Sequence, residues 1–106
     1  MNREQLACAA GFYNGEGSLC YSRGYVQLQV TQTAIDPLEQ FQRAIGFGSI
    51  NGPYRNKQHK QRWYYGVYGF KKCQAIIAML WEWLSLDKRK QAQIVFNKFH
   101  SKRKEK

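Results

Sequence analysis

The chain contains two pairs of short segments in which apolar and polar residues alternate, as they do in strands with one buried face. Residues 18–33 hold the first pair, and an Arg-Gly dipeptide between its halves predicts a hairpin turn. Val26, Leu28 and Val30 share one face of the second strand, so we expect that face in the core. Residues 48–70 hold the second pair, which predicts another hairpin.

Four further segments have the spacing and end signals of helices. They are residues 3–14, 36–45, 71–84 and 88–100, followed by a basic tail at 101–106. The order along the chain is therefore one helix, two strands, one helix, two strands and two helices. It predicts a single α+β domain over residues 1–106, with a four-stranded antiparallel sheet and the helices on one face.

The first predicted helix is unusually rich in small residues. Several of them recur at spacings of three and four, which places them on one face and lets a second helix approach closely. They are Ala7, Ala10, Gly11 and Asn14. If the second helix belongs to another copy of the chain, the two Glu16 carboxylates meet at the two-fold axis of a homodimer. Two acids are the minimum for a divalent-metal phosphodiesterase site. From the Gly-Glu-Gly spacing alone, a helix end with a solvated carboxylate is the simpler interpretation.

Positive charge dominates the chain and is concentrated in its second half. The 106 residues include 17 Lys and Arg against 7 Asp and Glu, a formal net charge of +10. Residues 1–50 hold three basic and four acidic side chains, a net of −1, so residues 51–106 carry +11. Such an asymmetry indicates a polyanionic partner, commonly nucleic acid, and a solvated basic face is the alternative.

Missing patterns exclude several other classes of function. The two His and three Cys have no zinc-site spacing, and the sequence has no phosphate-loop or dinucleotide signature. Cys8, Cys20 and Cys73 are odd in number and far apart, which indicates a reducing intracellular compartment, either a bacterial or phage-infected cytoplasm or an organelle. The longest apolar stretch, residues 75–84, is too short to span a membrane. We expect neither membrane association nor a small-molecule substrate.

Residues 9–17, AAGFYNGEG, resemble the LAGLIDADG motif of homing endonucleases. The positions that match in kind are Ala10, Gly11, Gly15, Glu16 and Gly17. The GSL that follows, the QVTQ at residues 29–32 and the LSLDKRKQAQIVF at residues 84–96 are similar to blocks of the homodimeric, intron-encoded members. The order α-β-β-α-β-β-α is similar to that of the family and covers nearly the whole chain.

The resemblance implies a DNA endonuclease that depends on Mg²⁺ or Mn²⁺. It implies that Glu16 is the metal ligand, helped by the Gly15 carbonyl. It also implies that Lys88 is the basic residue of the active site and that Gln32 positions the attacking water. The plain alternatives are a surface charge for Lys88 and a strand-end hydrogen bond for Gln32.

The chain departs from the family pattern at three positions. Asn14 replaces the usual acid, which in the family is generally a structural residue of the helix end. Glu16 replaces the more common Asp and carries its carboxylate one methylene further out. Asp36 lies where a basic partner is expected in close relatives, so the basic side of the site falls to Lys88 and Arg89.

The polar face of the predicted sheet is suited to the major groove of DNA. Its Gln side chains match adenine edges, its Arg side chains match guanine, and its Tyr side chains can pack on thymine methyls or sugars. Residues 55–62 hold four Lys or Arg and no acid, so we expect them to contact phosphates. The predicted DNA-binding set is Arg23, Gln27, Gln29, Thr31, Arg55, Lys57, Lys60, Arg62, Tyr64 and Tyr68.

The two-fold symmetry of a homodimer implies a pseudo-palindromic double-stranded target that is cut on both strands. Two alternatives remain open. One is a noncleaving DNA-binding regulator or RNA maturase on the same scaffold. The other is a small basic RNA-binding protein of ribosomal type.

Overall fold

One antiparallel sheet of four strands organises the chain. The computed structural model describes residues 2–55 and 60–104, without the side chains of residues 103 and 104. The strands are β1 (Gly17–Ser22), β2 (Tyr25–Gln32), β3 (Ser49–Arg55) and β4 (Gln61–Tyr68). Their order across the sheet is β1-β2-β4-β3, so the two predicted hairpins are confirmed and meet through β2 and β4.

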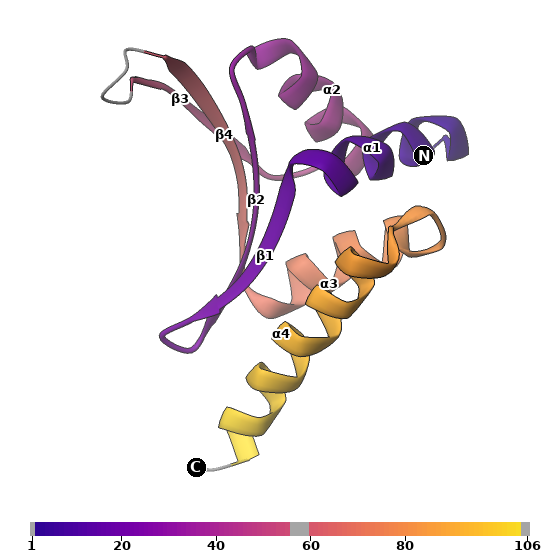
Figure 1. Cartoon of the computed structure of the whole chain (residues 1–106), viewed down its shortest axis with the longest axis vertical. Coiled ribbons are helices and arrows are strands. Elements are labelled where there is room, and N and C mark those ends of the chain that lie inside the picture. Colours follow the sequence, from indigo (N-terminus) through magenta and orange to yellow (C-terminus); the bar gives the residue numbers. More distant parts are fainter. Residues whose placement is uncertain (1, 56–59, 105–106) are drawn as a thin grey trace.

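The helices all lie against the same face of this sheet (Figure 1). They are α1 (Arg3–Glu16), α2 (Ile35–Ile45), α3 (Phe70–Leu80), the short 3₁₀ helix η1 (Trp81–Trp83) and α4 (Leu86–Lys104). The other face of the sheet is concave and is turned away from the helices (Figure 1). The predicted α+β architecture is confirmed.

The core fills the space between the sheet and the helices. Val26, Leu28 and Val30 are fully buried, as their alternation with polar residues predicts. Tyr65 on β4 packs edge-to-face on Phe41 of α2, with ring centroids 4.9 Å apart. Its hydroxyl donates a hydrogen bond to the Phe47 carbonyl at 2.7 Å, which satisfies the one polar atom of the ring in the core.

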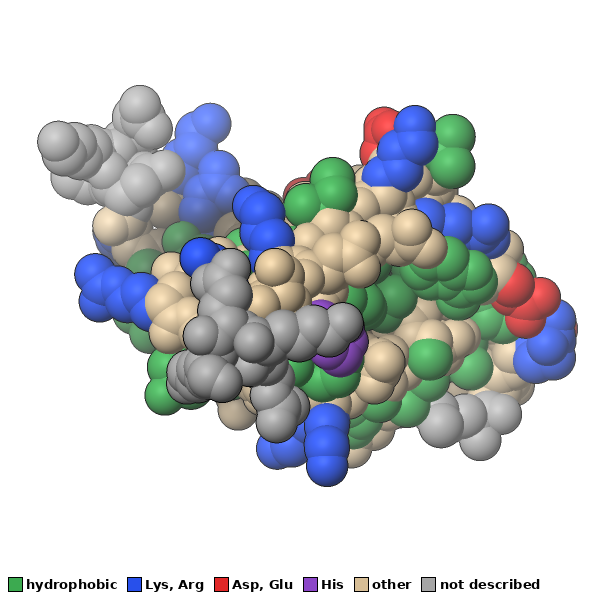
Figure 2. Space-filling model, turned by 90° about the horizontal axis from the view of Figure 1, so that it is seen from below, with side chains coloured by type: hydrophobic (Ala, Val, Ile, Leu, Met, Phe, Trp, Pro, Cys, Tyr) green, Lys and Arg blue, Asp and Glu red, His purple; other side chains and the backbone are tan. Residues whose placement is uncertain are grey.

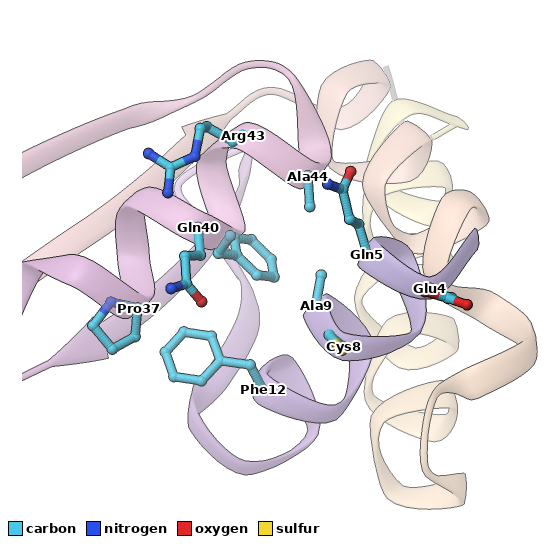
Figure 3. Close-up of a pocket in the computed structure, with 10 residues that line it drawn as sticks. Glu4, Gln5, Cys8, Ala9, Phe12, Pro37, Gln40, Arg43 and Ala44 are labelled. Atoms are coloured by element: carbon cyan, nitrogen blue, oxygen red, sulfur yellow. The ribbon is translucent and has the colours of Figure 1, made fainter. Parts of the chain in front are cut away.

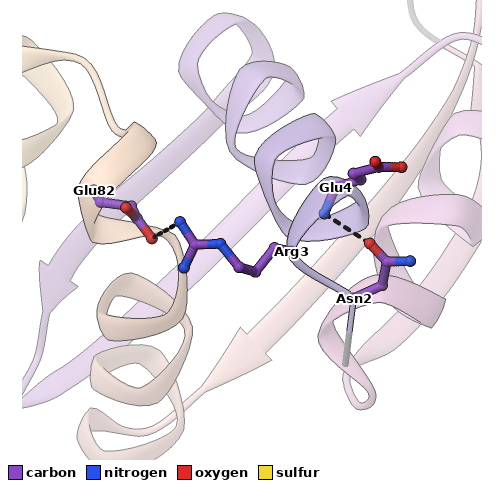
Figure 4. Close-up of polar contacts among 4 residues, drawn as sticks. All are labelled: Asn2, Arg3, Glu4 and Glu82. Carbon is purple, nitrogen blue, oxygen red and sulfur yellow. Dashed lines mark hydrogen bonds and ion pairs between the residues drawn. The ribbon is translucent and has the colours of Figure 1, made fainter.

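Both ends of α1 are fixed. The Asn2 side chain caps the first turn, because its Oδ1 accepts from the Glu4 backbone N–H at 2.7 Å (Figure 4). Arg3 forms an ion pair with Glu82 of η1 at 3.1 Å (Figure 4). Its guanidinium also lies over the Trp83 ring. The other end of α1 runs directly into β1, so the direction of the first helix is set by the sheet.

The C-terminal helices differ from the predicted boundaries. The predicted helix over residues 71–84 ends at Leu80 and tightens into η1, which turns the chain so that Leu84 is buried. Because the Ser85 hydroxyl accepts a hydrogen bond from the Lys88 backbone N–H at 3.3 Å, α4 begins at Leu86, two residues before its predicted start. It continues to Lys104, so residues 101–104 of the predicted tail are helical.

No helix within residues 2–55 and 60–104 combines the length and the apolarity that a membrane span requires.

Candidate active site and nucleic-acid interface

The C-terminal end of α1 carries an exposed carboxylate. Glu16 is the last residue of the helix, and its side chain forms no hydrogen bond or ion pair with any residue in the described part of the chain. Gly17 follows and donates its backbone N–H to the Tyr13 carbonyl. Only glycine fits there, because a Cβ on residue 17 would overlap the buried Tyr13 ring. The turn out of the helix is therefore fixed tightly next to Glu16.

Lys88 on the first turn of α4 is directed at this helix end. Its Nζ donates a hydrogen bond to the Gly17 carbonyl at 2.5 Å and lies 5.7 Å from the centroid of the Tyr13 ring. Burial raises the pKa of Tyr13, so the phenol beside the ammonium stays neutral at physiological pH. Lys88 is half-buried and has a defined acceptor, which separates it from an ordinary solvated surface charge.

Gln32 lies at the same end of the sheet. The β1–β2 register pairs Gly17 with Val30, so the last residue of β2 extends beyond this pair toward α1. Its Oε1 accepts a hydrogen bond from the Thr33 backbone N–H at 2.8 Å. The strand-end hydrogen bond expected as the plain alternative is therefore present, and a role for Gln32 toward water stays a prediction.

Arg89 is engaged elsewhere. Its Nε donates to the Trp81 carbonyl at 3.1 Å, and its guanidinium lies 5.2 Å from the centroid of the Trp81 ring. The basic side of the site is therefore occupied by Lys88 rather than by both side chains.

The chemistry of the helix end suits a hard divalent cation. Within the described residues, no group of three or more His, Cys, Asp and Glu side chains gathers as a metal site. The last turn of α1 has no basic residue, and helix C-termini carry a partial negative charge that favours cations. The donors present are the Glu16 carboxylate and backbone carbonyls such as that of Gly15, and Mg²⁺ and Mn²⁺ prefer such oxygen ligands.

The structure corrects the predicted dimer face of α1. Ala10 is fully buried in the core of its own chain and cannot face a partner. The Asn14 amide is engaged inside the chain, where it bonds to Trp83 and Ser85. Ala7 is half-buried, and of the four predicted residues only Gly11 is exposed.

The exposed face of α1 is offset from the predicted one. It consists of Glu4, Cys8, Gly11 and Gly15, at spacings of four, three and four. A Cβ on Gly11 or on Gly15 would meet no atom within 4 Å, so the backbone is uncovered along this line. We call these four residues the open face of α1. It ends next to Glu16.

A groove between α1 and α2 borders the open face (Figure 3). Its volume is about 460 Å³, and Phe12, Phe41 and Ala44 form its apolar floor. Gln40 and Arg43 of α2 lie on its rim. The apolar surface beside α1 thus continues beyond the open face itself.

The concave face of the sheet carries the predicted base-reading residues. Alternate residues of β2 point away from the core, which places Gln27, Gln29 and Thr31 on this face. The strand register sets Tyr68 opposite Gln27 and Tyr64 opposite Thr31. Gln27 Nε2 donates a hydrogen bond to the Tyr68 hydroxyl at 3.4 Å.

Several polar residues on this face were not predicted. Cys20 pairs with Gln27 across β1 and β2, and Asn51 pairs with Tyr64 across β3 and β4. The further members are Ser18, Ser49 and Tyr54. Their signal in the sequence is the alternation of polar residues with Leu19 and Ile50, which becomes informative once the strand register is known.

The predicted cationic residues lie around the ends of the strands. Arg23 is in the β1–β2 turn with a φ of 52°, Arg55 ends β3, and Lys60 directly precedes β4. Arg62 lies within β4, and Lys57 falls outside the described residues. Viewed from the end where α4 finishes, the surface shows far more Lys and Arg than Asp and Glu (Figure 2).

Comparison with known proteins bears on this arrangement. No family model matches the sequence, and no curated protein matches it. The homing endonuclease I-CvuI, in complex with its target in the presence of Ca, matches with a TM-score of 0.71 and 25% identity, over 90% of this chain and 65% of that one. The archaeal intron-encoded homing endonuclease I-Vdi141I, complexed with DNA, matches with a TM-score of 0.64 and 21% identity, over 81% of this chain and 61% of that one. The LAGLIDADG meganuclease I-CpaMI, bound to uncleaved DNA, matches with a TM-score of 0.60 and 20% identity, over 94% of this chain and 38% of that one.

This chain has the fold of the LAGLIDADG homing endonucleases. The residues that resemble the LAGLIDADG motif form the end of α1, and the blocks of similar sequence at residues 29–32 and 84–96 lie at the end of β2 and across the start of α4. These three blocks therefore meet at the C-terminal end of α1. The chain spans 65% of the length of I-CvuI and 38% of that of I-CpaMI.

Proposed function

We propose that this LAGLIDADG protein is a site-specific double-stranded DNA endonuclease that acts as a homodimer with a divalent metal. Two side chains at the end of α1 carry the proposal. The Glu16 carboxylate has no partner, and the Lys88 ammonium is held at the carbonyl of Gly17, the next residue of the turn. A protein that only bound nucleic acid would need neither a free acid nor a buried contact for the lysine at this position.

The composition of the site supports a homodimer. One chain offers one carboxylate at the end of α1, and the open face leads directly to it. Packing this face against its copy across a two-fold axis would bring two Glu16 residues together. Each would keep its own Lys88 at the Gly17 carbonyl.

The roles of the side chains follow from charge. Glu16 and the Gly15 carbonyl would hold Mg²⁺ or Mn²⁺, which supplies charge neutralisation and an acidic bound water when present. The Lys88 ammonium is positioned to stabilise negative charge that develops on the phosphate. Gln32 would orient the attacking water after its amide leaves the Thr33 backbone.

The concave face would read the DNA. Gln27 and Gln29 each offer a donor and an acceptor to adenine edges, and the basic strand ends would hold the phosphates. I-CvuI, I-Vdi141I and I-CpaMI are all complexed with DNA, which supports a DNA partner for the same fold. Two copies would read a pseudo-palindromic target.

The test uses a randomised library of duplex DNA, because cleavage is expected only at a suitable target sequence. I-CvuI in complex with the I-CreI target left that DNA uncleaved in the presence of Mg. The protein and Mg²⁺ are incubated with the library, and the new ends are sequenced. We expect double-strand cuts at one pseudo-palindromic family of sequences. Binding is measured in parallel in Ca²⁺.

Two variants, one at the site and one matched control, show whether cleavage depends on the Glu16 carboxylate. Glu16→Gln keeps the shape of the side chain and removes its charge, so cleavage should vanish while binding persists. Glu39→Gln makes the same chemical change on α2, at a residue outside the predicted site, and should cleave normally. Sequence-specific binding without cleavage in any divalent metal would instead support a noncleaving regulator. Preference for single-stranded or folded RNA would support a maturase or ribosomal role.

A further inference from the structure

Asn14 connects three elements around the start of α4. It lies in the last turn of α1, and its Nδ2 donates to the Trp83 carbonyl at 3.0 Å. Its Oδ1 accepts from the Ser85 backbone N–H at 2.9 Å. These two backbone groups flank Leu84, which is buried, so a single side chain closes the junction between η1 and α4.

The two bonds require an amide. One partner is a carbonyl and can only accept, and the other is an N–H and can only donate. Asn has one group of each kind, whereas an ionised Asp has two acceptors. An Asp at this position, usual in the motif that residues 9–17 resemble, would keep the bond to Ser85 and place an oxygen against the Trp83 carbonyl.

The junction is coupled to Lys88 over one helical turn. Ser85 is the N-cap of α4, and its hydroxyl accepts from the Lys88 backbone N–H at 3.3 Å. One turn beyond Lys88, Gln91 Oε1 accepts from the Leu19 backbone N–H of β1 at 3.1 Å. Lys88 therefore lies between two points at which α4 is anchored to α1 and β1.

We propose that Asn14 is a positioning residue, whose amide clamps the η1–α4 junction to the end of α1 and thereby holds the Lys88 ammonium at the Gly17 carbonyl beside Glu16. The proposal rests on the function above only where it concerns cleavage. The clamp itself is a property of the free protein. In this chain, restoring the acid of the motif should therefore weaken the site.

The first test needs no DNA and no variant. The Ser85 amide hydrogen should exchange with solvent more slowly than the amides of Leu86 and Asp87, because the first N–H groups of a helix have no intrahelical acceptor and Ser85 alone is bonded to Asn14. Exchange of the Ser85 amide at the rate of those two neighbours would overturn the clamp.

The second test measures the reactivity of Lys88 toward reductive methylation, read by mass spectrometry in the free protein. Lys90, exposed on the same helix, is the internal reference. In Asn14→Asp, methylation of Lys88 should accelerate several-fold relative to Lys90. Asn97→Asp, the same change at an exposed position of α4, should leave the ratio unchanged. A folded Asn14→Asp protein with the wild-type ratio would overturn the proposal, and circular dichroism verifies the fold.

Cleavage provides the functional readout. Asn14→Asp should slow single-turnover cleavage on the order of a hundredfold, as small misplacements of catalytic groups do. Binding to the same DNA in Ca²⁺ should change less than about threefold, because the concave face and the clamp lie on opposite sides of the sheet (Figure 1). Equal losses in binding and cleavage would contradict a positioning role. If the wild-type protein cleaves no DNA, the exchange and methylation results still decide the clamp, so the two proposals fail separately.

Discussion

Gly11 lies at the middle of the open face of α1. We expect its replacement by Ala to have opposite effects on the stability of the monomer and of the dimer. In the single chain, the added methyl meets no atom within 4 Å, so it removes only the conformational penalty of a glycine in a helix. That penalty is about 0.5–1 kcal/mol relative to Ala. For a domain of this size, about 1 kcal/mol corresponds to roughly 4–8 °C in the unfolding midpoint. The monomer should therefore unfold about 2–8 °C higher.

The dimer should respond in the opposite sense. If two copies pack their open faces together at close range, a methyl at position 11 lies between two backbones and weakens their association. At concentrations where sedimentation shows dimer, Gly11→Ala should raise the dissociation constant and lose the stabilisation seen in dilute protein. The assay is thermal unfolding by circular dichroism at two concentrations, with sedimentation at each.

The matched control is Gly17→Ala, which adds the same methyl where it overlaps the Tyr13 ring. It should destabilise at both concentrations by about 1–3 kcal/mol, the usual cost of overpacking. A lower unfolding midpoint for the Gly11→Ala monomer would show that the backbone at Gly11 is not uncovered. A higher midpoint with unchanged dimer affinity would show that the helices do not meet at Gly11.

Three further predictions follow from the core and the concave face. Burial raises the pKa of Cys73 from 9.0 to about 11, so folding favours the neutral thiol. The contribution of this thiol to the free energy of unfolding should be complete below pH 9 and be lost as the pH rises through about 11. Urea titration at stepped pH measures it. Iodoacetamide at neutral pH, at a dilution where sedimentation shows monomer, should label the exposed Cys8 and Cys20 and spare the buried Cys73, counted by intact mass; rapid labelling of all three thiols would contradict the packing of α3 on the sheet. Tyr68→Phe removes the acceptor of the Gln27 amide and should relax discrimination at one base pair in each half-site by about 1–3 kcal/mol at most, without slowing cleavage of the best target; an unchanged specificity profile would show that the pair does not act in readout.

The sheet was predictable because its signal is local. Val26, Leu28 and Val30 alternate with polar residues, and a period of two can only place them on one face. The same alternation put Gln27 and Gln29 on the opposite face. The chain order of hairpins and helices then left few arrangements, and the α+β fold followed.

The face of α1 was harder to assign for a physical reason. Helical spacing shows which residues share a side, but small residues line both sides of this helix, so composition does not show which side is buried. Ala10 lies in the core, whereas Gly11 and Gly15 lie outside. The correct stripe depends on how α1 docks on the sheet, which is a tertiary property.

The site required the three-dimensional structure. Lys88 and Gly17 are 71 positions apart, and so are Asn14 and Ser85. No periodicity relates such positions, and the one signal for Lys88 in the sequence is the resemblance of residues 84–96 to the family. The engagement of Arg89 with Trp81 and the amide clamp at Asn14 come from packing alone.

The central claim is that one active site is built from two copies of Glu16, and subunit mixing tests it most directly. Wild-type chains and Glu16→Gln chains are mixed at constant total concentration, allowed to exchange subunits, and assayed for the total number of strands cut in the selected target, with single-strand nicks counted. If both carboxylates are required, activity falls as the square of the wild-type fraction, leaving about one quarter in an equal mixture. A linear decrease, with about one half remaining, would mean that each chain cuts with its own Glu16 and would contradict the shared site.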